Sequence, residues 1–272
     1  MLVFLTCSAR KTSKEGKVVG KRKKKGKRGY PKLALVSLNP MKAYLWRIYS
    51  VRAKPLSVIK LGRKWTNATE SQLYRYFNDI LNKLKPMFSR GVRSLVVVSP
   101  DYPEFPEMFL KHLADHHQWL YQREQGHPLQ VLSLEGSTTD LDAVYSLFSG
   151  EEMQEKVFEL LEREADEIIA LLDECLSKDN GVVMVTIKEI EKLILPKKKH
   201  RRTWADYLIV NEEYLEEATP RQKNRLNRVF AIARNKGVKQ RVLPPECPAS
   251  DRLASLGGIA CFLTYDPRFE ML

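Results

Sequence analysis

The sequence has no long apolar run and no paired-cysteine motif. No stretch of 18 apolar residues occurs in the 272-residue chain, so no membrane-spanning helix is expected. The apolar start of the chain is too short for a secretory signal. The four cysteines are Cys7, Cys175, Cys247 and Cys261, and they form no CxxC pair. We therefore expect free thiols, a cytoplasmic location and no membrane contact.

Motifs that hold cofactors or metals are also missing. No Walker loop and no GxGxxG occurs, which argues against a nucleotide cofactor. His112 and His116 lie four residues apart on an expected helix, with His117 next to them, and such a histidine pair can ligate zinc. No HExxH motif accompanies them, and no cluster of carboxylates for Mg²⁺ can be assembled. We expect neither a cofactor nor a metal.

Positive charge is plentiful and concentrated. The net charge is +13, and residues 1–30 contribute eleven Lys/Arg against one acid, so this segment alone carries +10. Such a tail cannot bury a core and is expected to be disordered until a polyanion binds it. It is either a solubilising or misassigned N-terminus, or a segment that binds nucleic acid, ribosomal RNA above all. Its candidate RNA-binding residues are Lys21, Arg22, Lys23, Lys24, Lys25, Lys27 and Arg28.

A second basic cluster, "PKKKHRR", occupies residues 196–202. A basic loop is often only solvated, but two clusters in one chain favour a nucleic-acid partner. The candidate RNA-binding residues here are Lys197, Lys198, Lys199, Arg201 and Arg202.

The hydrophobic pattern predicts an α/β protein with two sandwich units. Three short strands are expected within residues 33–61, followed by helix, strand, helix and strand up to residue 136. A second strand–helix alternation begins near Gly181. The expected segments are a basic tail at 1–30, a first domain at 31–136, a connecting helical segment at 137–178 and a second domain at 179–272.

The connecting segment contains a long amphipathic helix. Its opposite face is rich in glutamate, and we interpret it as a solvated helix that bridges the two domains. The residues of its apolar face are Val157, Leu160, Leu161, Ile168, Ile169, Leu172 and Leu176.

Two stretches resemble a known superfamily. "DYLIVNEEYL" with the later "VKQRVLPPECPASDRLASLGGIACFLTY" resembles the C-terminal domain of Pelota and the archaeal–eukaryotic class-1 peptide-release factors. "PKLALVSLNPMKAYLWRIYSV" with "SLVVVSPDYP" is similar to their middle domain. The resemblance covers about residues 30–266. It implies a ribonuclease-H-like domain followed by a C-terminal-type domain that is like kink-turn-binding proteins.

The resemblance also implies a role on the ribosome. It implies rescue, quality control or protection of stalled or idle ribosomes, with rRNA and peptidyl-tRNA as contacts near the peptidyl-transferase centre. An elongation-factor-type GTPase is a possible partner, and a monomer is expected. The sequence departs from the superfamily in two ways: a counterpart of the N-terminal domain is absent, and so is Gly-Gly-Gln.

The loop that follows the third expected strand corresponds to the place where release factors carry Gly-Gly-Gln. It reads "GRKWTNATESQLYRYF", and Lys60, Arg63 and Lys64 are candidate RNA-binding residues around its start. "TESQ" resembles the Gly-x-x-Gln of release-factor-like peptidyl-tRNA hydrolases, which makes Gln72 a candidate for ester hydrolysis. Glu70 is a further candidate for that role.

The same residues also fit a purely structural role, because Thr69 and Gln72 have the spacing of a helix capping box. The sequence therefore leaves open a ribosome-binding protein, a peptidyl-tRNA hydrolase, an RNA-processing nuclease and a general RNA-binding protein.

Overall fold

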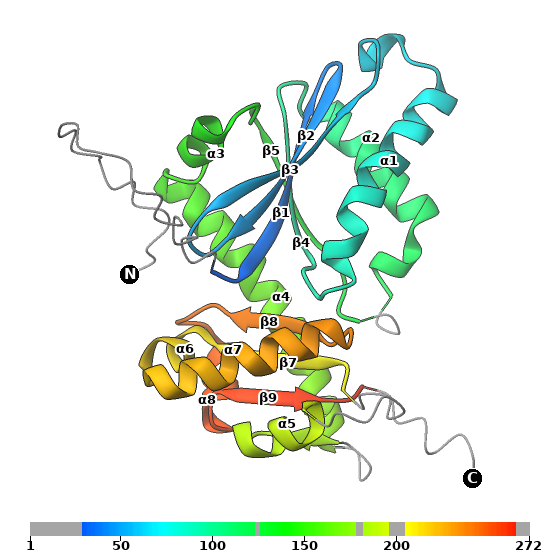
Figure 1. Ribbon diagram of the computed structural model, residues 1–272. Helices are drawn as coiled ribbons and strands as arrows, with labels where there is room; N and C mark the ends of the chain where they lie inside the picture. Colours follow the sequence, from blue (N-terminus) through cyan, green and yellow to red (C-terminus); the bar gives the residue numbers. More distant parts are fainter. Residues whose placement is uncertain (1–28, 123–125, 178–181, 196–204, 265–272) are drawn as a thin grey trace, which may run out of the picture.

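The computed structural model describes residues 29–122, 126–177, 182–195 and 205–264. These residues form two β-sheets, and helices cover both faces of each sheet (Figure 1). The α/β prediction is confirmed. Within the described ranges, no helix combines the length and apolar character that a bilayer crossing needs. The tail cations Lys21 to Arg28 and the cluster at 196–202 lie outside the described residues.

The N-terminal sheet has five strands in the order β3-β2-β1-β4-β5. The first three pair antiparallel, whereas β4 and β5 extend the sheet in parallel. This is the arrangement expected of a ribonuclease-H-like sheet. The strands are β1 (Pro31–Asn39), β2 (Lys42–Tyr49), β3 (Ala53–Lys60), β4 (Ser94–Ser99) and β5 (Gln130–Glu135).

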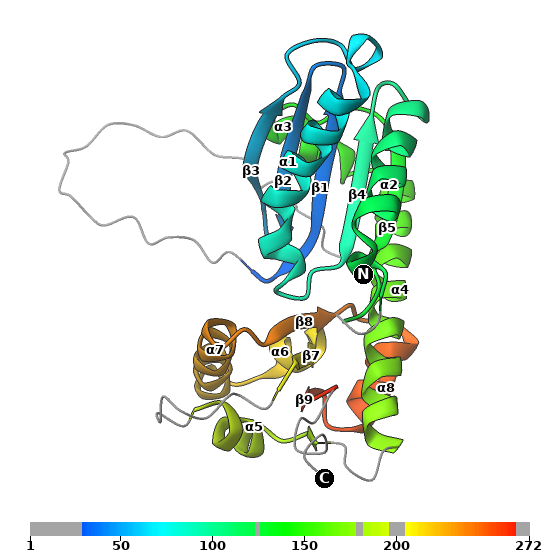
Figure 2. The same cartoon turned by 90° about the vertical axis from the view of Figure 1, so that its right-hand side faces the viewer.

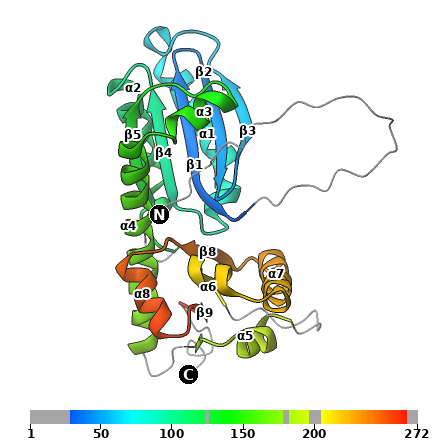
Figure 3. The ribbon, with the colours of Figure 1, turned by 90° about the vertical axis from the view of Figure 1, so that its left-hand side faces the viewer.

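Helices cover the two faces of this sheet in pairs. Helices α1 (Glu70–Phe88) and α2 (Glu104–His116) lie on one face, and α3 (Leu141–Leu147) lies on the other with the first half of α4 (Glu151–Ser177) (Figures 2 and 3). Side chains of β1 alternate between the two cores because successive residues of a strand point to opposite faces. Two short 3₁₀ helices, η1 (Trp65–Asn67) and η2 (Gln118–Leu120), complete this part.

The C-terminal sheet has four strands in the order β6-β9-β7-β8. Helices α5, α6 and α7 cover one face, and α8 covers the other together with the second half of α4. The strands are β6 (Val183–Met184), β7 (Tyr207–Asn211), β8 (Lys239–Leu243) and β9 (Ile259–Phe262). The helices are α5 (Ile187–Ile194), α6 (Glu212–Glu217), α7 (Pro220–Asn235) and α8 (Pro248–Ser255).

Helix α4 belongs to both cores. Val157 and Leu160 pack in the core of the N-terminal sheet, whereas Ile168 and Leu172 pack in that of the C-terminal sheet. Helix α4 therefore packs against both sheets, and one full face of it is buried. The apolar face ends before Leu176, which is 41% exposed.

Candidate functional site

The loop between β3 and α1 lies at the end of the N-terminal sheet that is farthest from the C-terminal sheet (Figure 1). The 19 residues of α1 correspond to about 28 Å along the helix axis, which separates this end from the junction of the two sheets. Gly62, at the turn that leaves β3, adopts φ +86°, a left-handed backbone conformation that favours glycine. The space beside its α-carbon is open, because no atom lies within 4 Å of the position that a Cβ would take.

Trp65 anchors this loop to the body of the molecule. Its backbone N–H donates to the carbonyl of Pro40 at 2.9 Å, and its indole Nε1 donates to Asp101 Oδ2 at 2.8 Å. The indole also stacks on Phe105 with ring centroids 4.9 Å apart. The loop is therefore fixed by side-chain contacts, unlike a glycine-rich loop that works through backbone freedom.

The structure places Gln72 in a capping box with Thr69. The Thr69 backbone N–H donates to Gln72 Oε1 at 3.0 Å, and the Gln72 backbone N–H donates to Thr69 Oγ1 at 3.4 Å. Two backbone donors at the start of α1 are thereby satisfied. Glu70 is exposed in the first turn, where the helix dipole stabilises a carboxylate. The side chains that served as catalytic candidates thus occupy positions that suit the helix start.

Four cations surround this loop. Lys42 and Lys60 lie opposite each other in the β2–β3 ladder, and Arg63 and Lys64 follow in the loop. All four residues are exposed. We call Lys42, Lys60, Arg63 and Lys64 the basic tip. It includes the three RNA-binding candidates that the sequence predicted in this region, and it adds Lys42 from the neighbouring strand.

The three histidines of α2 and its end pack together with Tyr74. The ring centroid of His112 lies 4.9 Å from that of His116 and 5.3 Å from that of His117. Burial, together with the charges of His117 and His116, lowers the pKa of His112 to about 4. In the described part of the chain, no group of three or more His, Cys, Asp or Glu is arranged to hold a metal ion. His112 and His116 are both in edge-to-face ring contact with Tyr74.

A buried polar network joins the two sheets. We call it the intersheet network, and it consists of Arg93, Ser94, His127, Glu164, Tyr207 and Arg241. Glu164 of α4 stands at its centre with 1% of its surface exposed. Its Oε1 accepts from the Arg93 backbone N–H at 2.8 Å and lies 2.9 Å from His127 Nε2. Its Oε2 accepts from Ser94 Oγ at 2.5 Å and from the Arg241 guanidinium.

His127 continues the network towards the C-terminal sheet. Both its backbone N–H and its ring Nδ1 lie 3.0 Å from the hydroxyl of Tyr207 on β7. Burial lowers the pKa of His127 despite its bond to Glu164, so the ring is neutral at pH 7. A neutral ring that donates from Nε2 to Glu164 and accepts at Nδ1 from Tyr207 satisfies all of these groups.

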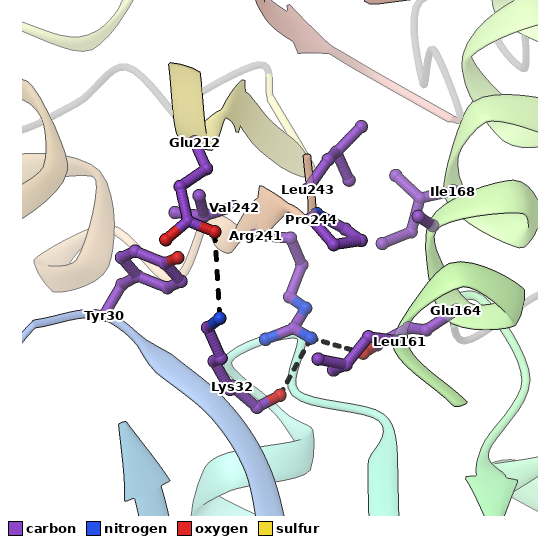
Figure 4. A pocket seen from close by; sticks show the side chains of 11 residues that line it. Tyr30, Lys32, Leu161, Glu164, Ile168, Glu212, Arg241, Val242, Leu243 and Pro244 are labelled. Carbon is purple, nitrogen blue, oxygen red and sulfur yellow. Dashed lines mark hydrogen bonds and ion pairs between the residues drawn. The ribbon is translucent and has the colours of Figure 1, made fainter. Parts of the chain in front are cut away.

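Arg241 of β8 carries the network across to β1. Its Nη1 donates to the carbonyl of Pro31 at 2.9 Å, and its Nη2 donates to that of Lys32 at 3.0 Å. The Lys32 ammonium forms an ion pair with Glu212 at 3.7 Å. Figure 4 shows these side chains around a small recess whose cavity volume is about 10 Å³, room for about one water molecule.

The charge balance of this network favours an ionised Glu164. Burial on its own raises the pKa of a carboxyl group, but Arg241, His127 and Ser94 outweigh it, and the pKa of Glu164 lies below its ordinary value. A buried ion is tolerated only when charge and hydrogen bonds both compensate it, and Glu164 has both. The network therefore fixes how the two sheets sit on each other.

The sequence analysis missed this network. One feature of the sequence does point to the network, namely the position of Glu164 on α4. This residue follows Leu160 by four residues and Leu161 by three, and it precedes Ile168 by four. That spacing puts a glutamate on the apolar face of α4, where an unpaired carboxylate would be costly. The identity of its partners depends on contacts between segments up to 77 residues apart, which no local pattern reveals.

The chain is an α/β protein with two β-sheets, and one long helix, α4, packs against both of them. No protein-family model and no curated protein sequence matches it. Among solved structures, a chain in a structure of ribosome-bound archaeal Pelota and ABCE1 is 18% identical over 86% of this chain and 62% of its own length, with a TM-score of 0.47.

Two further structures match in the same way. Dom34 of S. cerevisiae, a translation termination-like factor that interacts with Hbs1, is 17% identical over 86% of this chain and 64% of its own, with a TM-score of 0.46. Archaeoglobus fulgidus Pelota is 18% identical over 88% of this chain and 66% of its own, with a TM-score of 0.37. This chain thus spans 62% to 66% of the length of these chains.

Proposed function

We propose that this protein is a ribosome-associated, release-factor-like protein that binds ribosomal RNA or tRNA through the basic tip. The observation that carries the proposal is the position of the tip. Four exposed cations surround the loop between β3 and α1, at the place that corresponds in the resembled superfamily to the loop entering the peptidyl-transferase centre. Clustered exposed cations are the usual means of binding RNA phosphates.

The anchored loop supports binding rather than catalysis. Trp65 and the capping box hold its backbone and Gln72, and no glycine lies near Gln72. A protein of this kind would occupy stalled or idle ribosomes in rescue, quality control or protection, and an elongation-factor-type GTPase is its proposed partner.

Sedimentation of the full chain with ribosomes through sucrose gradients at several salt concentrations tests this function. The variant Arg63→Gln/Lys64→Gln is expected to leave the ribosomal fractions at lower salt than the wild type. The matched control Lys111→Gln/Arg163→Gln removes the same charge from exposed positions on α2 and α4 and is expected to sediment like the wild type. A wild-type protein that is absent from all ribosomal fractions at low salt would overturn the proposal.

The hydrolase alternative has a separate test in a peptide-release assay on stalled ribosomes. Gln72→Glu keeps an acceptor for the Thr69 N–H and so preserves the cap, but it removes the amide donor. Equal peptide release by the wild type, Gln72→Glu and Gln72→Ala would remove the catalytic role of Gln72. Loss of release in Gln72→Glu, with unchanged stability, would assign one.

A further inference from the structure

Residues 218–245 contain no aspartate or glutamate. The whole chain has 33 acidic residues among 272, so a stretch of this length would be expected to hold about three of them. Instead it holds eight cations: Arg221, Lys223, Arg225, Arg228, Arg234, Lys236, Lys239 and Arg241. Helix α7 makes up most of this stretch.

The helix divides these residues sharply between two faces. Leu226, Val229 and Ala233 face the core of the C-terminal sheet. The outward face is formed by arginine and asparagine with a single alanine: Arg221, Asn224, Asn227, Arg228, Ala231, Arg234 and Asn235 are all exposed. A solvated helix usually carries charges of both signs on its outer face, so this composition points to a binding partner.

Half of the eight cations already have partners. Arg225 binds both carboxylate oxygens of Glu191, at 3.0 and 2.7 Å, and Lys223 donates to the carbonyl of Glu216. Lys239 lies over the ring of Tyr207, and Arg241 belongs to the intersheet network. The other four form no salt bridge with any described residue, and they are Arg221, Arg228, Arg234 and Lys236.

We propose that the outward face of α7 is a second RNA-binding surface, which contacts the phosphate backbone of a folded RNA. This inference rests on the proposed function and adds a contact on the other sheet. The 16 residues of α7 span about 24 Å, a length comparable with several consecutive phosphates. Arginine and asparagine side chains donate hydrogen bonds to phosphate and sugar oxygens.

The composition of this face argues for RNA over an acidic protein. Protein interfaces are built around a core of buried apolar and aromatic side chains. Among the described residues, no large hydrophobic side chain of α7 is exposed, whereas nucleic-acid interfaces are polar and strongly basic. The start of β8, which follows α7 in the chain, borders the turn after α1: the Gln240 N–H donates to the carbonyl of the exposed Arg90 at 3.0 Å.

The test compares Arg228→Gln/Arg234→Gln with the control Lys111→Gln/Arg163→Gln, both in the full chain. Binding to a fluorescent RNA duplex is measured by anisotropy from 50 to about 200 mM salt. Two lost phosphate contacts are expected to reduce the slope of log K against log salt by about 2 and to weaken binding by about tenfold, while the control behaves as wild type. Circular dichroism shows whether the variants keep the wild-type fold, as expected for exposed positions.

Three results separate the possible failures. If the wild type sediments with ribosomes but Arg228→Gln/Arg234→Gln has an unchanged salt slope and unchanged sedimentation, the α7 proposal is overturned and the function of the basic tip stands. If the α7 variant loses duplex binding but the wild type never sediments with ribosomes, the ribosomal function falls and the RNA surface stands. If polyglutamate displaces the duplex as well as competitor RNA does at equal charge, the surface recognises acidic polymers in general and the RNA assignment is overturned.

Discussion

Glu164 stands at the centre of the intersheet network and contacts Arg93, Ser94, His127 and Arg241. It accepts hydrogen bonds from the Arg93 backbone N–H and the Ser94 hydroxyl in the N-terminal half, and it forms an ion pair with the buried Arg241 of β8. Such a residue contributes less through its own attraction than through the cost of leaving its partners alone. Even a conservative substitution of Glu164 is therefore expected to lower the free energy of unfolding strongly.

Glu164→Gln is expected to destabilise the protein by about 3 kcal/mol, because Arg241 stays buried without its counter-ion. Urea unfolding of the full chain measures this free energy. Glu159→Gln, an exposed position one to two turns earlier on α4, is the control and should change it by less than about 0.5 kcal/mol. The double variant Glu164→Met/Arg241→Met should be more stable than Glu164→Gln, and an equal or larger loss would contradict the role of the ion pair.

The cap of α1 gives a second prediction at the scale of single residues. Thr69→Ala removes the acceptor for the Gln72 N–H and is expected to lower the free energy of unfolding by about 1 kcal/mol. Thr69→Ser keeps the hydroxyl and should be close to wild type. Thermal unfolding of the three proteins checks this, and equal melting temperatures would show that the capping box does not stabilise the helix.

At the scale of elements, the loop before α1 is a rigid connection because of Trp65. Trp65→Phe keeps an aromatic ring against Phe105 but loses the hydrogen bond to Asp101, at an expected cost of about 1 kcal/mol. Trp65→Ala also loses the stacking and should cost more.

Hydrogen exchange offers a local measurement of the same anchor. The amides of Leu61 and Trp65, which donate to the carbonyls of Met41 and Pro40, should exchange faster in Trp65→Ala, while β4 amides stay protected. Unchanged exchange at Leu61 would mean that the backbone bonds alone hold the loop.

At the scale of the whole molecule, three buried groups make stability depend on pH. The pKa values of His112 and His127 lie below the ordinary value near 6.5, so these histidines bind protons more readily in the unfolded chain. Their contribution is present above about pH 6.5 and is lost as the pH falls. Glu164 has a lowered pKa, so its contribution is present above about pH 4.3 and is lost below it.

The melting temperature of the wild type is therefore expected to fall between pH 7 and pH 5 and to fall further below pH 4.5. In His112→Leu the decrease between pH 7 and pH 5 should be smaller, because His112 Nε2 is buried without a hydrogen-bond partner among the described residues and leucine removes its protonation. Circular dichroism melts in a pH series measure both proteins. Parallel curves for the two would contradict the role of His112.

The sequence by itself determined the elements and their class. The span of α1, the strands of both sheets and the capping pair Thr69 and Gln72 follow from spacing and side-chain type, which are local properties. The resemblance to release-factor domains came from the same local patterns. The basic tip was also visible in part, because Lys60, Arg63 and Lys64 are close together in the chain.

Only the tertiary structure decided which distant residues meet. Lys42 joins the tip through the pairing of β2 with β3, and Trp65 finds Asp101 36 residues away. The partners of Glu164 come from segments that fold against α4 from both sheets. Long-range contacts depend on how the sheets pack around the shared helix, and periodicity along the chain carries no information about which buried donors will reach a given carboxylate.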